Sequence, residues 1–244
     1  MTTIPLSIII PAYNEGVPIR STIDAVWRYL ARRGAGFEII VVDDGSTDGT
    51  AGIVKDLRTA YPGLTCIENA GNRGKGASVR RGFLQSRGDL VLFSDADLST
   101  PAEEFGNLLA AVEDGADIAA GSRAHKGSRI LKRQRACREL MGKSFNLMVR
   151  ALGMSALRDT QCGCKVFRRE TCTRIFLEQR VNRFAFDVEL LFLAERAGLK
   201  VVEVPVQWIN APASTVRLFP DSARMAFDII AIRVRQMEGR YSRR

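Results

Sequence analysis

The sequence contains little cysteine or histidine, no long apolar run and no linker-like segment. One histidine, His125, and five cysteines without zinc-ligand spacing argue against a structural zinc site. The odd number of cysteines is typical of reduced, buried thiols, which favours a cytosolic location over a disulfide framework. No apolar stretch reaches the ~18 residues of a membrane-spanning helix, so we expect no transmembrane segment and no signal peptide. Because no stretch rich in Pro, Gly or Ser interrupts the chain, we expect one domain over residues 1–244.

The composition is that of a soluble globular protein with an excess of positive charge. Of the residues, 46% are hydrophobic and 26% are charged, which excludes a disordered or collagen-like chain. There are 36 Lys and Arg against 27 Asp and Glu, so the formal net charge is +9 at pH 7. This excess indicates an anionic partner, which composition alone leaves open as a nucleic acid, a lipid surface or a phosphorylated substrate.

Strand-like and helical patterns alternate through the first half of the chain. Short apolar runs that predict buried strands occupy residues 6–11, 37–42, 64–68 and 90–94. A segment with helical spacing follows each of the first three runs, and such repeated βαβ units predict an α/β fold. We therefore expect a Rossmann-like, doubly wound and mostly parallel sheet with helices on both faces. Further strands are expected at 117–121 and 201–208, and helices at 138–152, 186–196 and 221–237.

Three of the predicted strands end in polar residues, at the edge where doubly wound sheets bind ligands. The strand at 90–94 is followed by Asp95 and Asp97, and the strand at 37–42 by Asp43 and Asp44. The first strand leads into Tyr13-Asn14-Glu15. Two carboxylates on one turn suit a divalent cation that bridges a diphosphate. The alternative at both aspartate pairs is helix capping by the Ser, Thr and Asp residues in the same loops.

A glycine-rich loop and a basic stretch supply candidate phosphate ligands. Arg73 and Lys75 alternate with glycines that allow the backbone to approach a phosphate at a helix start, although the spacing is not that of a P-loop. Seven basic side chains and no acidic one follow between residues 123 and 138. They are Arg123, Lys126, Arg129, Lys132, Arg133, Arg135 and Arg138. This run is either a solvated loop or a site for a lipid headgroup or an acceptor phosphate.

Together these motifs resemble the family 2 glycosyltransferases of the GT-A fold. The segments that carry the resemblance are SIIIPAYNE at 7–15, VVDDGSTDGT at 41–50, GNRGKG at 71–76 and DADL at 95–98. Three later segments are similar to the dolichyl-phosphate β-glucosyltransferases and related polyprenyl-phosphate glycosyltransferases. These are GSRAH at 121–125, RDTQCGCKVF at 158–167 and FAFDVELL at 184–191. The similarity extends over residues 5–237.

The resemblance implies a role for each matching residue. The positions that match the binding site of a uridine diphosphate sugar are Pro11, Tyr13, Glu15, Asp43, Asp44, Lys75 and Asp95. Asp95 and Asp97 would hold Mg²⁺ or Mn²⁺, and Asp97, Asp187 and Arg123 match catalytic positions. Arg123 and Arg138 match positions associated with the acceptor phosphate. The family's Ser-Lys-Val segment is Ser214-Thr215-Val216 here, so the phosphate role of its lysine is lost or passes to Arg217.

The implied reaction is transfer of glucose from UDP-glucose, with inversion, to a polyprenyl or dolichyl phosphate. Residues 1–120 would bind the nucleotide sugar and residues 121–244 the acceptor. The alternatives are mannose transfer from GDP-mannose, a sugar-1-phosphate nucleotidyltransferase, and a non-enzymatic module that binds lipid or nucleic acid. A nucleotidyltransferase would need a glycine-rich loop with a lysine after the first strand, where this chain has Tyr13-Asn14-Glu15. A binding module would not explain why three strands end in acidic residues. We therefore expect no nucleic-acid partner.

A lipid acceptor implies contact with a membrane. Relatives usually have an apolar anchor, which we do not find in this sequence, so we expect peripheral association with the cytoplasmic face. The amphipathic segment 221–237 offers Met225, Ile229 and Ile232 together with arginines, and an arginine-rich tail follows it. Such a segment suits an anionic membrane surface. The alternative is that this helix packs on the body of the protein and its arginines are merely solvated.

Overall fold

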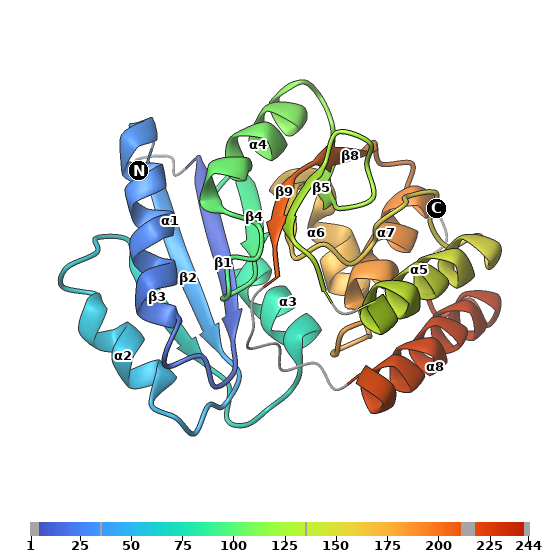
Figure 1. The fold of residues 1–244 in the computed structure, drawn as a ribbon, viewed down its shortest axis with the longest axis horizontal. Coiled ribbons are helices and arrows are strands. Elements are labelled where there is room, and N and C mark those ends of the chain that lie inside the picture. The colour runs from blue at the N-terminus through green and yellow to red at the C-terminus, as the bar shows by residue number, and fades with distance from the viewer. Residues whose placement is uncertain (1–4, 35, 135, 211–217, 242–244) are drawn as a thin grey trace.

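A seven-stranded sheet runs through the molecule in the order β3-β2-β1-β4-β7-β5-β8 (Figure 1). The structure is a computed structural model that describes all residues except 1–4, 35, 135, 211–217 and 242–244. The strands are β1 (Leu6–Ala12), β2 (Phe37–Asp43), β3 (Leu64–Glu68), β4 (Leu90–Ser94), β5 (Ile118–Ser122), β6 (Arg129–Lys132), β7 (Cys164–Arg168), β8 (Val201–Pro205) and β9 (Gln207–Ile209). The helices are α1 (Ile19–Arg33), α2 (Thr50–Leu57), α3 (Lys75–Gln85), α4 (Phe105–Glu113), α5 (Ala136–Ala151), α6 (Arg169–Glu178), α7 (Phe186–Arg196) and α8 (Leu218–Met237), with a 3₁₀ turn, η1, at Ala102–Glu104.

The first four strands form where the sequence predicts them, because a parallel strand covered on both faces needs an almost continuous apolar run. All seven residues of β1 are buried, and successive side chains alternate between two cores. Ile8 and Ile10 enter one core, and Ile9 enters the other. β1 pairs in parallel with β2 and with β4, and Ala12 lies opposite Asp43 at the end of the pair. The polar residues that follow these strands therefore share one edge of the sheet.

The predicted α/β fold with a mostly parallel sheet is confirmed, and the structure adds elements that the sequence analysis missed. β7 runs antiparallel between β4 and β5, so that Ser94 lies opposite Cys164. The helix α6 follows β7 directly. The strand expected at 201–208 is divided at Val206 into β8, which joins the main sheet, and β9, which pairs with β6 in a separate two-stranded sheet.

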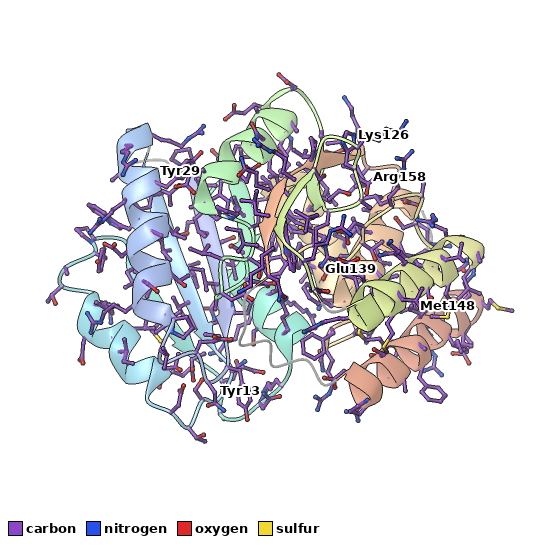
Figure 2. All side chains as sticks on the ribbon, in the orientation of Figure 1. Tyr13, Tyr29, Lys126, Glu139, Met148 and Arg158 are labelled. Atoms are coloured by element: carbon purple, nitrogen blue, oxygen red, sulfur yellow. The ribbon has the colours of Figure 1, made fainter. Side chains whose placement is uncertain are left out.

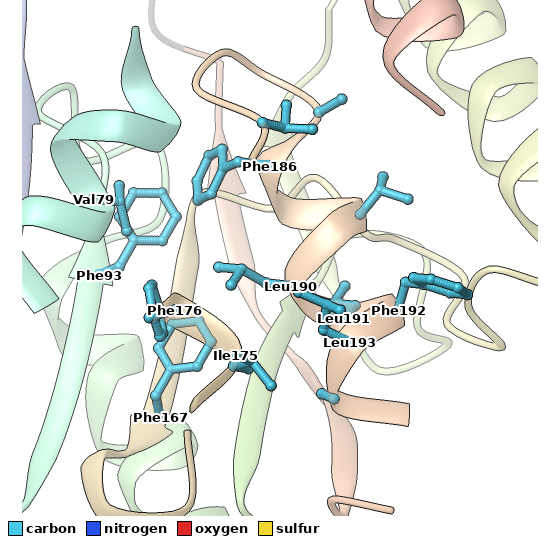
Figure 3. Packing of buried hydrophobic residues seen from close by; sticks show 14 of the residues in the cluster. Val79, Phe93, Phe167, Ile175, Phe176, Phe186, Leu190, Leu191, Phe192 and Leu193 are labelled. Atoms are coloured by element: carbon cyan, nitrogen blue, oxygen red, sulfur yellow. The ribbon is translucent and has the colours of Figure 1, made fainter. Parts of the chain in front are cut away.

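Helices cover the two faces of the sheet with separate cores. One core contains apolar side chains of α1, α2 and α4, and the other contains those of α3, α6 and α7. In the second core the rings of Phe83 and Phe176 stack at a centroid distance of 3.7 Å, and Phe167 meets both rings edge-on. Figure 3 shows Phe167 and Phe176 beside the leucines of α7. The second core thus joins β7 and α6 to the first half of the chain.

Two long helices, α5 and α8, lie side by side at one end of the molecule (Figure 1). The side chains of Met225, Ile229 and Ile232 point into the second core and are almost fully buried. Of the two alternatives predicted for this face of the helix, membrane contact and packing on the protein, the structure favours packing on the protein. No helix among the described residues is both long and apolar enough to cross a bilayer.

Candidate active site

The loops that follow β1 and β2 are fastened to each other by hydrogen bonds. Asn14 Oδ1 accepts a hydrogen bond from Thr47 N (2.9 Å), and Asn14 N donates one to Ser46 Oγ (2.9 Å). Asn14 adopts a φ of 56°, in the left-handed region that asparagine tolerates better than most residues. The connection holds Tyr13 and Glu15 at the carboxyl edge of the sheet, where Figure 2 labels Tyr13.

The two aspartates at the end of β2 have different surroundings. Asp44 Oδ1 accepts hydrogen bonds from Asn69 Nδ2 (2.7 Å) and from Arg73 N (3.0 Å). Asp44 Oδ2 accepts a third from Gly74 N (2.7 Å), so this carboxylate ties the β2 end to the glycine-rich loop. Asp43 Oδ1 is buried and has no hydrogen-bond partner among the described residues. An unpaired buried oxygen is costly, and no described residue compensates Asp43 Oδ1.

Another aspartate of the second loop, Asp48, accepts hydrogen bonds from the backbone of two segments. Asp48 Oδ1 accepts a hydrogen bond from Thr50 N (3.1 Å) at the start of α2. Asp48 Oδ2 accepts one from Gly16 N (2.8 Å). The N-cap residue of α2 is Gly49, which has no side-chain cap, so the bond from Thr50 N to Asp48 lies outside the N-cap position, and Asp43 and Asp44 do not cap α2.

The glycine-rich loop uses two of its glycines for packing. A Cβ atom at Gly74 would lie 2.4 Å from Asn182 O, and one at Gly76 would lie 2.5 Å from Phe186 Cβ. These glycines were predicted to allow close approach of a phosphate, and in the structure both allow residues 182 and 186 to approach α3. Lys75 between them is the first residue of α3, as expected of a side chain at a helix start.

A cluster of charges surrounds the pair Asp95 and Asp97. Lys75 Nζ lies 2.6 Å from Asp95 Oδ1, and Asp97 Oδ1 accepts a hydrogen bond from Ser99 N (2.9 Å). Burial and the charge of Asp95 raise the pKa of Asp97. Burial, followed by the charges of Asp97 and Asp95, raises the pKa of Glu15 from 4.5 to about 7. Among the described residues, the acidic groups of Glu15, Asp95 and Asp97 thus share one partly buried region with a single lysine, Lys75.

This region suits a divalent cation. Crowded carboxylates with raised pKa values are stabilised by a nearby positive charge. No group of three or more His, Cys, Asp or Glu side chains among the described residues is arranged to hold a metal. A cation bound here would therefore take one or two carboxylates from the protein and its other ligands from substrate phosphates and water, which is the usual way of binding Mg²⁺.

Asp187, the first acidic residue of α7, is paired with a buried lysine. Lys165 Nζ lies 2.9 Å from Asp187 Oδ1 and donates a second hydrogen bond to Cys162 O (2.7 Å). Both side chains are almost completely buried. Burial raises the pKa of Asp187 although the charges of Lys165 and Lys75 oppose it. The lysine comes from β7, so the antiparallel strand fixes the orientation of this carboxylate.

Arg123 and Arg138 lie at the start of the acceptor half expected from the sequence. The guanidinium of Arg123 makes two hydrogen bonds to Asp159, at 2.7 and 2.8 Å, and the Arg123 backbone N makes another at 2.9 Å. Burial alone would raise the pKa of Asp159, but the charge of Arg123 lowers it from 3.8 to about 2. Arg123 also lies over the ring of Trp208, at 5.6 Å from the centroid. Arg138 belongs to α5 and is half-buried.

Three adjoining cavities connect these residues. The first, of about 510 Å³, is lined by Pro11, Tyr13, Glu15, Asp44, Lys75, Asp95 and Asp97, with other residues, and it does not include Asp43. The second, of about 550 Å³, shares Lys75, Asp95 and Asp97 with the first and adds Asp187, Arg123 and Arg138. The third, of about 630 Å³, shares Arg123 and Arg138 with the second. The structure therefore brings ten of the eleven predicted site residues to one continuous set of cavities.

Several residues of these cavities were not chosen as site residues from the sequence. Arg183 and Phe184 line the first cavity, and Phe184 also lines the second. Two other residues that were not predicted, Asp159 and Lys165, form ion pairs with the predicted residues Arg123 and Asp187. Both lie in the segment RDTQCGCKVF at 158–167, where polar residues among apolar ones were the only sequence feature that pointed to them. Ser214, Thr215, Val216 and Arg217 lie outside the described residues.

The described cysteines are free thiols in apolar or half-buried surroundings. Cys162, Cys164 and Cys172 are buried, and Cys66 is partly buried. Burial raises the pKa of the Cys172 thiol to about 12 and that of Cys66 to about 11. Both thiols are therefore protonated near neutral pH and are poor nucleophiles.

Comparisons with known proteins agree on one family. Residues 7–176 match the profile of glycosyl transferase family 2. The chain is 36% identical over 246 residues to a dolichyl-phosphate β-glucosyltransferase of Dictyostelium discoideum, and the match covers 96% of this chain and 75% of that protein. It is 35% identical to the dolichyl-phosphate β-glucosyltransferase of Saccharomyces cerevisiae, covering 97% of this chain and 76% of the yeast protein.

Solved structures with the same fold are also similar to this chain. A glucosyl-3-phosphoglycerate synthase from Mycobacterium tuberculosis, in complex with Mn²⁺, UDP and glucosyl-3-phosphoglycerate, superposes with a TM-score of 0.70 at 20% identity. That match covers 98% of this chain and 81% of the mycobacterial one. The mannosyl-3-phosphoglycerate synthase of Rubrobacter xylanophilus gives a TM-score of 0.71 at 25% identity, covering 97% of this chain and 76% of that one.

Proposed function

This chain belongs to glycosyl transferase family 2, and on that premise we propose that it transfers glucose from UDP-glucose to a polyprenyl phosphate of the dolichyl type. The predicted GT-A fold and the predicted enzyme class, a glycosyltransferase, are confirmed. A non-enzymatic binding module is therefore excluded. The observation that carries the choice of substrates is the similarity to dolichyl-phosphate β-glucosyltransferases over more than nine-tenths of the chain.

The cavity beside Tyr13 and Glu15 is the proposed site for the nucleotide sugar. Its volume of about 510 Å³ is in the range of small-molecule sites, and its acidic wall faces the second cavity. Asp95 and Asp97 would hold Mg²⁺ or Mn²⁺ beside the diphosphate. A divalent cation there supplies charge neutralisation to the diphosphate as it leaves. Lys75, whose pKa is raised by Asp95 and Asp187 despite burial, adds a permanent positive charge at the same place.

The acceptor phosphate is proposed to bind at Arg123 and Arg138. At 4–5 Å and an effective dielectric of about 20, like charges on the two substrates repel by about 3–4 kcal/mol per pair. The two arginines line the cavity that also contains Asp95 and Asp97, so their charges act against this repulsion. The guanidinium of Arg123 donates two hydrogen bonds to Asp159, which keep the arginine in place. Arg123 is thus preorganised before the acceptor binds.

The proposed reaction needs little help from a general base. The second pKa of a phosphate monoester is near 6, so the acceptor oxygen is already anionic at neutral pH. Asp187 is held against Lys165 and is almost fully buried. We therefore assign to Asp187 the orientation of the sugar, because the acceptor needs no base and Lys165 already holds the Asp187 carboxylate in one position. Attack by the phosphate oxygen from the face opposite the diphosphate gives the β-linked product.

A long-chain polyprenyl phosphate resides in a membrane, so we propose that the chain works at the cytoplasmic surface of a bilayer as a peripheral protein. The formal net charge of +9 favours an anionic surface. This part of the proposal is independent of the identity of the transferred sugar.

The experiment that tests the proposal is a matrix of donors and acceptors. UDP-glucose, UDP-galactose and GDP-mannose are each combined with dolichyl phosphate, undecaprenyl phosphate and 3-phosphoglycerate, in the presence of Mg²⁺ or Mn²⁺. We expect a lipid-soluble product with UDP-glucose and a prenyl phosphate. Lipid product from GDP-mannose alone would replace glucose by mannose, and glucose transfer to 3-phosphoglycerate alone would overturn the lipid acceptor.

A further inference from the structure

The helix α8 carries apolar side chains on two opposite faces. Met225, Ile229 and Ile232 point into the core. At about 100° per residue, Phe227, Ile230, Val234 and Met237 fall on the opposite side of the helix. The exposed fractions of these four are 71%, 52%, 46% and 80%. The outward face of a surface helix is ordinarily polar, so this second apolar stripe requires an explanation.

The neighbouring helix α5 contributes two more exposed leucines. Leu140 and Leu147, which are two turns apart, are 66% and 60% exposed. Six of the twelve large apolar side chains that are exposed in the described part of the chain therefore lie on these two helices. We call this set, Leu140, Leu147, Phe227, Ile230, Val234 and Met237, the α5–α8 ridge. A concentration of this kind on one end of the molecule marks an interaction surface.

The charges on the same two helices are mostly positive. Within their bounds there are six basic residues, Arg138, Lys143, Arg150, Arg224, Arg233 and Arg235, and three acidic ones, Glu139, Asp221 and Asp228. Lys143 and Arg150 are exposed on α5, and Arg224 is exposed on α8. Exposed apolar side chains flanked by cations are typical of helices that lie in the interface of an anionic membrane.

The cavity that contains the candidate metal ligands reaches the same pair of helices. Its lining continues from Asp95 and Asp97 to Leu140 and Met148 of α5 and to Met225 of α8. Met148 lies where α5 faces α8 (Figure 2). A prenyl chain attached to a phosphate in this cavity therefore has an apolar route toward the α5–α8 ridge. This route for a prenyl chain rests on the proposed function. The exposed apolar side chains and the charges beside them are observed whatever the function is.

We propose that the α5–α8 ridge docks this protein on an anionic bilayer, with the apolar side chains in the interfacial layer and the flanking cations against lipid phosphates. The occupant of the face is a lipid surface and not a second protein. The docking contact differs from the one expected from the sequence, because Met225, Ile229 and Ile232 are committed to the core. The face that meets the membrane is the opposite side of α8, together with α5.

The test measures vesicle binding by flotation in the absence of any prenyl phosphate or nucleotide sugar. Vesicles of phosphatidylcholine are compared with vesicles in which about a third of the lipid is phosphatidylglycerol, since cationic flanks favour anionic lipids. The ridge variant is Leu147→Ser/Phe227→Ser/Val234→Ser. The control variant is Leu84→Ser/Leu177→Ser, which removes exposed leucines from α3 and α6. Thermal unfolding of both variants verifies that each remains folded.

We expect the wild type and the control to bind anionic vesicles, and the ridge variant to bind at least ~10-fold more weakly. Binding of the wild type should also weaken in high salt. Equal binding by the ridge variant and the control would overturn the proposal. A wild-type dimer that becomes a monomer in the ridge variant, seen by light scattering, would also overturn it and assign the face to self-association.

An activity measurement separates this inference from the proposed function. Transfer to a short, water-soluble prenyl phosphate should be the same in the ridge variant and the wild type, because none of the three substituted residues lines the cavities. Transfer to a long-chain acceptor carried in anionic vesicles should fall with the loss of vesicle binding. Normal vesicle binding by the wild type without transfer to any prenyl phosphate would refute the proposed function and would not contradict docking through the α5–α8 ridge. Transfer to both acceptors at wild-type rates by the ridge variant would refute the ridge alone.

Discussion

The carboxylate of Asp95 lies directly against the backbone of Gly163. A Cβ atom at residue 163 would be 1.9 Å from Asp95 Oδ2, and Asp95 N donates a hydrogen bond to Gly163 O (3.0 Å). The contact arises because β7 pairs antiparallel with β4, which places Cys164 opposite Ser94. The second half of the chain thus forms one wall of the site around Asp95 and Asp97, which come from the first half.

Gly163→Ala should displace the Asp95 carboxylate and lower transfer activity by about 100-fold, because a misplaced carboxylate loses its fixed geometry. Gly52→Ala is the matched control, since a Cβ atom at Gly52 meets nothing within 4 Å. The control should keep full activity and gain up to ~1 kcal/mol in helix stability. The measurement is kcat at saturating substrates for both variants. Normal kcat in Gly163→Ala would contradict the role given to this contact.

Asp97→Ala should remove most transfer activity and weaken the binding of UDP only when a divalent cation is present. The reason is that the carboxylate is proposed to act through the cation and not through the nucleotide itself. Calorimetric titration with UDP, with Mn²⁺ or with EDTA, measures this directly. If the variant and the wild type respond equally to Mn²⁺ and to EDTA, the assignment of the cation to Asp97 is wrong.

Arg138→Ala should raise the apparent KM for polyprenyl phosphate far more than the KM for UDP-glucose. Loss of a charge-assisted contact typically costs ~1.5–3 kcal/mol, which corresponds to a ~10- to 100-fold change. Arg123→Ala should have the same effect on the acceptor and also lower the free energy of unfolding by about 3–5 kcal/mol, because it leaves Asp159 buried without its partner. Steady-state kinetics and urea unfolding distinguish the two variants. An unchanged acceptor KM in both would move the phosphate site elsewhere.

The Arg123–Asp159 pair should make stability depend on pH in the acid range. The pKa of Asp159 falls from 3.8 to about 2 on folding, so the carboxylate stabilises the folded state above pH ~4. This contribution, on the order of 2 kcal/mol, is lost as the pH falls from about 4 to about 2. Asp159→Asn should therefore be less stable than the wild type at pH 6, and the gap should narrow below pH 4. A gap that is constant from pH 6 to pH 3 would contradict the ion-pair account.

The sequence predicts one edge of the site well, because three continuous apolar runs each end in polar residues. In a parallel sheet this pattern alone places Glu15 and Asp95 at the same edge. β7 was not predicted because its five residues include Lys165, which interrupts the apolar pattern of a buried strand. The lysine can be buried because Asp187 from α7 pairs with it, and the sequence does not show this pairing. The glycines at 74 and 76 were assigned to phosphate approach because the sequence does not show that residues 182 and 186 pack against them. The exposed apolar face of α8 was not predicted either, since only the burial seen in the structure shows which of the two apolar stripes of this helix faces the core.

The structure of the product made from UDP-glucose and a polyprenyl phosphate decides whether the chain catalyses the proposed reaction. The purified protein is incubated with both substrates and a divalent cation, and the lipid product is analysed by mass spectrometry and by the NMR coupling at the anomeric carbon. We predict a glucosyl polyprenyl phosphate in the β configuration, formed by the wild type and in far smaller amount by Asp97→Ala. An α-linked product, or the absence of any glucosylated lipid from a folded wild-type protein, would contradict the account.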